Sequence, residues 1–308
     1  MMYVEDLKLG REVSAAQLLS MMRSMGGFMG MHVGQAFEIL KEMIWDEKCL
    51  RALSFTGNLV ATGLRGVIAE LLRRKLFDIV VTTCGALDHD IARTRSSYRQ
   101  GSFDADDWQL AEKNIHRLGS VFIEQESYGV VIEREVRALL DEHGFDGPVS
   151  SHRLCWAIGE RLGSESSFLF WCWRNKIPVF VPGIYDGAVG YQLWLQGREK
   201  NVSLDYSEDM NLLNEYMWNA ERKGGLVVGG GISKHHLLWW SQFGGEGLDM
   251  AVYITAADEY DGSLSGARPR EAVSWHKVSP RAKHVFVKAD ATVVLPLLAL
   301  GLIQSGKD

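Results

Sequence analysis

The sequence lacks the residue patterns of several common protein classes. Its cysteines form no C-x-x-C pair and no Cys/His cluster with zinc spacing. There is no basic excess, because 33 Lys and Arg face 39 Asp and Glu in a chain of 308 residues, so we expect no nucleic-acid partner. The four cysteines are expected to be reduced thiols in a cytoplasmic protein; they are Cys49, Cys84, Cys155 and Cys172.

A long hydrophobic run is also missing. The most apolar stretch, Ala291–Ile303, is interrupted by Pro296 and Gly301 and falls short of the ~20 residues that a membrane span needs. We interpret it as a buried terminal helix. The opening residues MMYVEDLKLGREVS carry early acids and no apolar run, so they do not indicate a signal peptide. We therefore expect no association with a membrane.

Short β-rich runs alternate with helical patterns along most of the chain. Continuous apolar runs are typical of strands that are buried on both faces and hence parallel. Five such runs are Phe77–Thr83, Ile177–Val181, Gly225–Val228, Met250–Thr255 and His284–Lys288. Helices are predicted at Asn58–Lys75, Tyr128–Glu142 and Ser207–Lys223, with Gly224 as a left-handed stop for the last. The alternation predicts an α/β fold, an open parallel sheet with helices on both faces.

The first 50 residues differ from the rest. They are rich in methionine and helical in pattern, and such stripes usually serve the core or subunit contacts. The methionines in question are Met21, Met22, Met25, Met29 and Met31. We therefore divide the chain into a helical segment, residues 1–50, and a catalytic domain, residues 51–308.

Small residues follow nearly every predicted strand. In parallel α/β sheets, ligands bind beyond the carboxyl ends of the strands, and small residues there let a ligand approach the backbone. The segment VVGGGI at 227–232 could cradle a phosphate, although the chain has neither G-x-G-x-x-G nor G-x-x-x-x-G-K-[ST]. Asn58, Asp186 and Asp290 are candidates for ribose contacts, with helix capping as the alternative role for each.

The segment YDGSLSGARPREAVSWHKV at 260–278 is the candidate for chemistry. Gly262, Gly266 and Pro269 predict a loop, which ends with Trp275 and Lys277 close together. A lysine becomes a nucleophile when its ammonium is desolvated, as beside an indole ring. An indole also packs against the methylenes or the cation of an amine. An exposed lysine beside a buried tryptophan is the alternative interpretation.

The stretch SGARPREAVSWHK closely resembles the active-site lysine segment of deoxyhypusine synthases. Further segments resemble the same family in the same order over roughly residues 50–305; they are FTGNLVATG, VTTCGALDHDI, IPVFVPGIYDGAVG, VVGGGISKHH and VKADATVVLPLL. The N-terminus is short, as in archaeal-type and bacterial-type members. The resemblance implies a Rossmann-like fold that binds NAD.

The resemblance also implies a reaction. Family members transfer the 4-aminobutyl group of spermidine to one lysine of the translation factor 5A precursor, forming deoxyhypusine. NAD takes a hydride from spermidine, the active-site lysine carries the resulting butylimine, and the product is reduced again. Members are homotetramers with active sites at dimer interfaces, which implies a transferase built from two chains around each site.

Residue roles follow from the matched motifs. Lys277 corresponds to the imine-forming nucleophile, and His235 to the histidine that handles the substrate amine, a role that suits a near-neutral pKa. Glu271 and Trp275 match the polyamine channel. The cofactor positions are Asn58, Thr83, Cys84, Gly85, His89, Asp186, Gly230, Gly231, Ala257, Ser263, Ser265, Asp290 and Ala291.

Several positions depart from the family pattern. Eukaryotic members have acids at two polyamine positions where this chain has Tyr191 and Leu264, and a leucine cannot pair with an ammonium. Asp258, Glu259 or an acid of another subunit could compensate. His89 replaces an acid facing the cofactor. Small polar residues are replaced at Gly57, Ala61 and Ala256.

These departures leave the amine donor and acceptor open. Agmatine could replace spermidine as donor, and putrescine could be the acceptor, as in homospermidine synthases, which are an offshoot of the family. A non-catalytic paralogue that binds NAD is a third hypothesis, against which the retained Lys277, His235, Glu271 and Trp275 argue.

Overall fold

The computed structural model describes residues 3–145 and 147–306, which form two compact units. Unit 1 comprises residues 1–55, 76–81 and 212–308, and unit 2 comprises residues 56–75 and 82–211. The division after Asn211 falls inside helix α11 (Tyr206–Asn219). Residues 1–50 thus share a unit with the C-terminal third of the chain. Whether they and residues 51–308 are separate functional domains stays a prediction.

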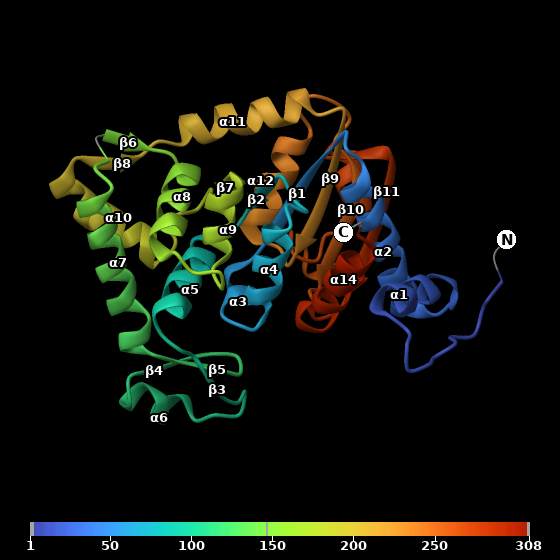
Figure 1. The fold of residues 1–308 in the computed structure, drawn as a ribbon, viewed down its shortest axis with the longest axis horizontal. Helices are drawn as coiled ribbons and strands as arrows, with labels where there is room; N and C mark the ends of the chain where they lie inside the picture. Colours follow the sequence, from blue (N-terminus) through green and yellow to red (C-terminus); the bar gives the residue numbers. More distant parts are fainter. Residues whose placement is uncertain (1–2, 146, 307–308) are drawn as a thin grey trace. The chain divides into compact units, whose positions relative to one another are not determined.

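Unit 1 is built around parallel strands flanked by helices (Figure 1). Its strands follow the order β11-β10-β9-β1-β2. They are β1 (Cys49–Phe55), β2 (Ile79–Val81), β9 (Arg222–Val228), β10 (Leu248–Thr255) and β11 (Val278–Lys288). Its helices are α1 (Ala15–Ser24), α2 (Phe28–Trp45), α12 (Gly231–Ser241), the short η2 (Glu259–Asp261), α13 (Pro269–Ser274) and α14 (Ala291–Ser305). This arrangement confirms the predicted open parallel sheet.

Two adjacent glycines show that helices cover both faces of this sheet. A Cβ at Gly224 would lie 2.5 Å from Cγ of Met43 on α2. A Cβ at Gly225 would lie 3.5 Å from Cδ2 of Leu237 on α12. Because successive side chains of a strand point to opposite faces, α2 and α12 lie on opposite sides of β9. Glycine at 224 allows α2 to approach the sheet closely.

The predicted helix at Ser207–Lys223 is wrong in its last turn. The helix α11 ends at Asn219, and Arg222 and Lys223 begin strand β9. Gly224 is therefore a strand residue, paired with Arg51 and Met250 on the neighbouring strands, and it ends no helix. Pairing on both sides of β9 outweighs the local preference for a helix stop, because a central strand satisfies every backbone group.

The remaining helix predictions hold in part. The region Asn58–Lys75 forms two helices, α3 (Gly57–Val60) and α4 (Leu64–Arg73), separated by a turn. Tyr128–Glu142 corresponds to α7 (Gly129–Glu142). The terminal helix α14 is confirmed, and it is buried on one face only: Leu298 is fully hidden, whereas Val293 is 70% exposed.

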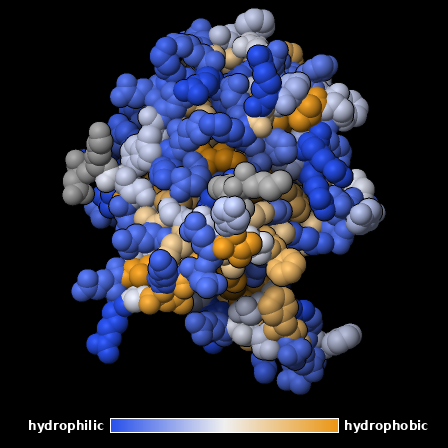
Figure 2. Space-filling model, turned by 90° about the vertical axis from the view of Figure 1, so that its right-hand side faces the viewer, coloured by the Kyte–Doolittle hydropathy of each residue, from blue (hydrophilic) through white to orange (hydrophobic). Residues whose placement is uncertain are grey.

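The N-terminal segment is helical, as predicted, and packs in unit 1. His32 Nδ1 on α2 lies 3.1 Å from the carbonyl oxygen of Phe286 on β11. Met29 Sδ lies 3.2 Å from the amide nitrogen of Lys288. Figure 2, which looks from the side that carries these helices, shows hydrophilic residues over most of that face and only small apolar patches. Met29 therefore contributes to packing, all five methionines are half-buried, and their part in subunit contacts stays a prediction.

Unit 2 is mainly helical, with two small sheets. The antiparallel sheet has the order β3-β5-β4, and β6 pairs in parallel with β8. Besides α3, α4 and α7, its helices are α5 (Cys84–Arg95), α6 (Asp107–Glu112), the short η1 (Gln125–Ser127), α8 (Ser151–Leu162), α9 (Phe168–Asn175) and α10 (Ala188–Lys200). Its strands are β3 (Arg99–Gln100), β4 (Ile115–Leu118), β5 (Val121–Glu124), β6 (Gly147–Val149), β7 (Val179–Phe180) and β8 (Val202–Leu204).

A buried ion pair fixes the interior of unit 2. Arg65 Nε on α4 donates to Asp90 Oδ1 on α5 over 2.6 Å, and both side chains are almost fully buried. Asp90 Oδ2 accepts from Ser167 Oγ at 2.6 Å and from the amide of Leu169 at 3.1 Å. Because every oxygen of this carboxylate has a partner, the buried charge is compensated and locks α4, α5 and α9 together.

Among the described residues, no helix is both long and apolar enough to cross a membrane. The four cysteines are free and buried, as the sequence predicts for reduced thiols. Burial raises the pKa of the Cys49 thiol to about 12, so it is a protonated, unreactive core group.

Candidate functional site

The segment around Lys277 is more ordered than a loop. Pro269 occupies the first turn of α13, where its fixed φ favours a helix and its missing N–H costs nothing. The prediction of a loop over residues 260–278 is therefore wrong in its second half, where residues 269–274 form helix α13. His276 then takes a left-handed conformation with φ 56°, which reverses the chain directly before Lys277 and β11.

Two backbone–backbone hydrogen bonds and one from a serine hydroxyl fix the main chain of Lys277. Its amide donates to Ala272 O on α13 over 3.0 Å. Its carbonyl accepts from the amide of Leu248 at 3.0 Å and from Ser241 Oγ at 2.8 Å. These partners come from α13, β10 and α12, so three elements position the base of the side chain. The lysine is half-buried.

Two indole rings flank the ammonium of Lys277. Its Nζ lies 5.4 Å from the ring centroid of Trp275 and 5.8 Å from that of Trp239 on α12. His235, one turn earlier on α12, stacks on Trp239 with centroids 6.5 Å apart and planes inclined by 15°. The fold thus brings the predicted nucleophile and acid/base group to one aromatic residue. Trp239 was not predicted from the sequence, although its i+4 spacing from His235 was a usable signal.

Lys234 is a second residue of this region that was not predicted from the sequence. Its side chain is 1% exposed, and its Nζ donates to the carbonyl oxygens of Leu264 and Ala267, each over 2.7 Å. Nζ also lies 4.6 Å from the ring centroid of Tyr253. Burial lowers the pKa of Lys234 to about 8, opposed by the negative charge of Glu271. Its position among Leu237, Leu238 and Ser241 at helical spacing was the available signal for an inward-facing lysine.

The 263–267 segment is held against the glycines that follow β9. Ser265 Oγ accepts from the amide of Gly231 at 3.3 Å. A Cβ at Gly230 would collide with both the side chain and the Cα of Ser265, so only glycine fits there. Gly231 has φ 65° and opens α12, whose first amides are directed beyond the carboxyl end of β9. This geometry suits a phosphate or another anion.

Residues after β10 and β11 lie along the same edge of the sheet. Ala257 follows β10, and its amide donates to Thr255 Oγ1 over 3.1 Å. Asp290 follows β11 and caps α14, with Oδ1 accepting from the Thr292 amide at 2.8 Å. Ala291 is the first residue of that helix. Because β9, β10 and β11 are parallel neighbours, their carboxyl ends share one edge.

Glu271, Ser263 and Leu264 occupy different surroundings in unit 1. Glu271 lies exposed in the first turn of α13. Ser263 is exposed, and its amide donates to Asp261 Oδ1 over 2.6 Å. Leu264 is half-buried and reaches Lys234 through its carbonyl.

In unit 2, the predicted cofactor residues at the starts of α3 and α5 meet. The amide of Gly57 donates to Thr83 Oγ1 over 3.1 Å, and a Cβ at Gly57 would lie 2.6 Å from the carbonyl carbon of Gly85. Asn58 is exposed, with Oδ1 accepting from Thr56 Oγ1 at 2.6 Å. The sequence marked Gly57 only as a departure from the family pattern. The close approach of the Gly85 backbone explains why a residue without a side chain is needed there.

Cys84 contacts a buried carboxylate that the sequence analysis did not single out. Asp88 accepts from the amides of Ala188 at 3.0 Å and Val189 at 2.8 Å, and from the Tyr128 hydroxyl at 2.9 Å. Cys84 Sγ lies 3.7 Å from Asp88 Oδ1. Burial raises the pKa of both Cys84 and Asp88. Asp88 therefore fixes the start of α10, which carries Tyr191.

His89 is buried, whereas Asp186 and Tyr191 are exposed. Nδ1 of His89 lies 2.9 Å from the Tyr98 hydroxyl oxygen. Burial lowers the pKa of His89 to about 4, with Arg93 adding a repulsive charge, so the ring is neutral near pH 7. A neutral ring packed on tyrosine carries no charge for a cofactor.

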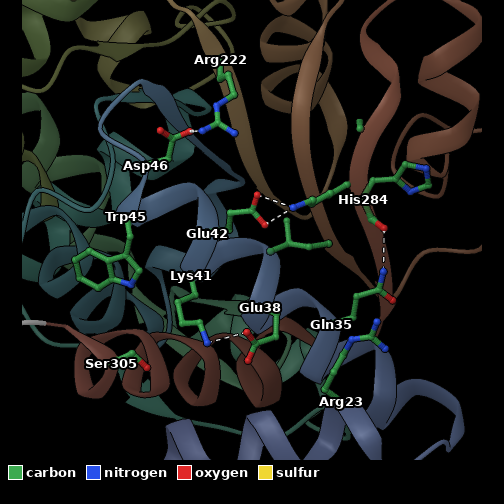
Figure 3. Close-up of a pocket in the computed structure, with 13 residues that line it drawn as sticks. Arg23, Gln35, Glu38, Lys41, Glu42, Trp45, Asp46, Arg222, His284 and Ser305 are labelled. Atoms are coloured by element: carbon green, nitrogen blue, oxygen red, sulfur yellow. Dashed lines mark hydrogen bonds and ion pairs between the residues drawn. The ribbon is translucent and has the colours of Figure 1, made fainter. Parts of the chain in front are cut away.

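A hollow of about 980 Å³ elsewhere in unit 1 holds none of the predicted site residues (Figure 3). Opposite charges pair along its wall. Lys283 Nζ lies 2.6 Å from Glu42 Oε1, Lys41 Nζ lies 2.7 Å from Glu38 Oε2, and Arg222 pairs with Asp46. Four basic and three acidic side chains line the hollow, so its charges largely compensate one another.

Comparison with known proteins gives the family. The family model of deoxyhypusine synthase matches residues 17–302. The chain belongs to the deoxyhypusine synthase family. Within the deoxyhypusine synthases, it is 50% identical over 294 residues to a protein of Pyrobaculum calidifontis, covering 93% of this chain and 98% of that one. It is 48% identical over 306 residues to a protein of Ignicoccus hospitalis, covering 97% and 95%. Both relatives are named "Probable deoxyhypusine synthase".

The fold agrees with that membership. A crystal structure of a candidate deoxyhypusine synthase from Entamoeba histolytica aligns with a TM-score of 0.65 at 21% identity, covering 98% of this chain and 97% of that one. This similarity concerns the fold alone. As a deoxyhypusine synthase family member, the protein is an enzyme of the transferase class.

Proposed function

We propose that the protein transfers the 4-aminobutyl group of spermidine to one lysine of the translation factor 5A precursor, forming deoxyhypusine, with Lys277 as the covalent carrier. The observation that carries this proposal is the flanking of Lys277 by Trp275 and Trp239, the second of which also stacks on His235. Membership of the deoxyhypusine synthase family supports the same reaction.

In this reaction Lys277 Nζ attacks the carbon of an imine and 1,3-diaminopropane leaves, so one C=N bond replaces another. The acceptor lysine then displaces Lys277 in the same way. His235 is the proposed group that takes and returns the protons of these amines. Splitting the transfer into two exchanges on a fixed lysine lowers each barrier.

NAD is the proposed cofactor, and it would accept a hydride from the carbon beside the secondary amine of spermidine and return it to the product. The glycine turn at Gly230 and Gly231 before α12 fits an anionic phosphate, and the exposed carboxylate of Asp290 fits a ribose hydroxyl. In unit 1, Ala257, Ser263, Ser265 and Ala291 complete the proposed set. The resemblance to the family also assigns to cofactor binding six residues that lie in unit 2, Asn58, Thr83, Cys84, Gly85, His89 and Asp186.

Other parts of the proposal concern assembly and location. Glu271, Trp275, Tyr191 and Leu264 are the proposed polyamine-side residues. A homotetramer with sites at dimer interfaces, and a cytoplasmic location, are inferred from the family. Each is separately testable, the first by the mass of the assembly in solution.

Incubation with NAD and spermidine, followed by borohydride reduction and intact-mass measurement, tests the mechanism. We expect an aminobutyl adduct in the wild type that is absent in Lys277→Ala. Lys283→Ala, which removes an exposed lysine from the same strand region, is the matched control and should keep the adduct. A wild type that forms no adduct with spermidine or with agmatine contradicts covalent catalysis and favours a non-catalytic NAD-binding role.

A variant of the same chemistry is favoured by one observation. Leu264 and Tyr191 bring no carboxylate to the polyamine side, so the preferred amines differ from those of members with acids there. Spermidine with putrescine and no protein acceptor tests the homospermidine alternative. Homospermidine as product would move the acceptor from a protein lysine to a free diamine.

A further inference from the structure

Trp239 contacts both chemical groups of the unit 1 site. Its ring stacks on His235, and Lys277 Nζ lies 5.8 Å from its centroid. The indole also meets Phe243 edge-on, with centroids 6.2 Å apart. His235, Trp239 and Phe243 follow at i, i+4 and i+8 along one face of α12 and its end, so packing on both sides fixes the ring.

Trp239 is partly exposed, unlike the tryptophan that follows it in the chain. Its side chain is 46% exposed, whereas the neighbouring Trp240 is 8% exposed and packs on Phe243. Trp275, whose ring centroid lies 5.4 Å from the Lys277 ammonium, is 64% exposed. Both indoles are partly exposed and both lie within 6 Å of the Lys277 ammonium, so an amine that reaches Lys277 meets two aromatic rings that attract a cation.

The segment 263–267 offers no acidic side chain to an amine. Leu264, at a position expected to bind the polyamine, brings an apolar side chain, and its carbonyl is already used by Lys234. Glu271 is the acid nearest to this site in sequence, and its charge acts on Lys234. An aromatic face attracts a cation without a carboxylate and also packs against the methylenes between two amines.

We propose that Trp239 is a further amine-binding residue, which forms with Trp275 an aromatic cage for an aliphatic ammonium beside Lys277. The inference rests on the proposed function, because it names how the same site holds its polyamine. The cage takes over part of the recognition that a carboxylate at position 264 would provide. Stacking on His235 holds the ring in the orientation that faces Lys277.

Calorimetric binding of spermidine in the presence of NADH, which cannot accept a hydride, tests this proposal without turnover. We expect Trp239→Leu to bind spermidine about 2- to 30-fold more weakly, the range of cation–π contributions, and Trp239→Phe to lie between it and the wild type. Trp45→Leu is the matched control, because Trp45 has the same 46% exposure and lies at the end of α2. It should bind like the wild type.

The ranking of the variants by spermidine affinity decides whether Trp239 binds a cation or contributes only apolar packing. Equal affinity of Trp239→Phe and Trp239→Leu, or a wild-type affinity in Trp239→Leu, overturns the cage. If Trp239→Leu does not fold, as judged by circular dichroism, the comparison of the wild type with Trp239→Phe and Trp239→Tyr replaces it. Unchanged affinity in both of these and in Trp239→His then overturns the proposal.

The outcomes also separate this inference from the proposed function. A wild type that forms the borohydride-trapped adduct, together with a Trp239→Leu variant of unchanged affinity, overturns the cage alone. A wild type that binds no spermidine and forms no adduct overturns both.

Discussion

The ammonium of Lys234 lies 2.7 Å from the carbonyl oxygen of Leu264. This hydrogen bond and the one from the same ammonium to the carbonyl of Ala267 hold the 263–267 segment against helix α12. The segment carries Ser263 and Ser265, and the helix carries His235 and Trp239. A buried lysine that satisfies two backbone carbonyls acts as a cross-link between the proposed cofactor residues and the proposed amine-side residues of unit 1. Burial of this ammonium removes its hydration, and this desolvation lowers the pKa of Lys234 to about 8.

Lys234→Met should loosen the 258–267 segment. The change leaves two carbonyls without their donor, at a cost of about 1–3 kcal/mol for each buried group. Lys223→Met is the matched control, because Lys223 is also buried and donates to two carbonyls, those of Ser241 and Phe243, over 2.8 and 2.6 Å. We expect both variants to lose stability in urea unfolding. Only Lys234→Met should show faster hydrogen exchange over 258–267 and weaker NADH binding; equal exchange there in both variants contradicts the cross-link.

Gly230→Ala should weaken cofactor binding. The added methyl group would collide with the Cα of Ser265, a backbone atom, so the glycine turn or the 263–267 segment must move. We expect at least a tenfold loss of NADH affinity by fluorescence titration, about 1.4 kcal/mol. Gly66→Ala is the control, because that glycine lies inside α4 with open space around it. Gly66→Ala should bind NADH normally, and a normal Gly230→Ala would contradict the assignment of this turn.

His89→Gln should make the protein more resistant to acid. In the folded protein the pKa of His89 is lowered to about 4, so between pH 6.5 and 4 the unfolded chain binds the extra proton and the folded state loses stability as the pH falls. The shift corresponds to about 3 kcal/mol at most. Urea unfolding at pH 7, 5.5 and 4 should show a smaller decline in His89→Gln than in the wild type. The exposed His116→Gln should follow the wild type, and parallel curves for all three would refute the assignment.

Leu264→Asp should strengthen polyamine binding. A carboxylate on the segment fastened by Lys234 would attract an ammonium, and an ion pair of this kind is screened by salt. We expect severalfold tighter spermidine binding at low ionic strength, reduced at 0.5 M NaCl. Leu264→Asn has the same shape without the charge and should gain nothing. A gain of equal size in both variants would point to polarity in general and away from charge pairing.

The fold was predictable where the pattern was strong. Apolar runs ending in small residues located β9, β10 and β11, because parallel strands are buried on both faces and keep a continuous apolar pattern. The seven-residue strand β1 was not predicted, since Arg51 and Ser54 interrupt its apolar pattern. In the structure the charge of Arg51 is paired with Asp78 over 2.5 Å. The wrong end of the predicted helix has the same origin. Arg222 and Lys223 were interpreted as the last turn of a helix because they are charged, but they begin strand β9.

The sequence by itself determined the family, the candidate lysine and histidine, and the parallel α/β class, because motifs and apolar periodicity are local properties of the chain. The tertiary structure decided what surrounds them. Helix α12 brings Trp239 to Lys277 and Lys234 to the 264–267 carbonyls, although the partners are 38 and at least 30 residues apart in the chain. Such contacts depend on how α12 packs on the sheet, and no local pattern encodes that packing.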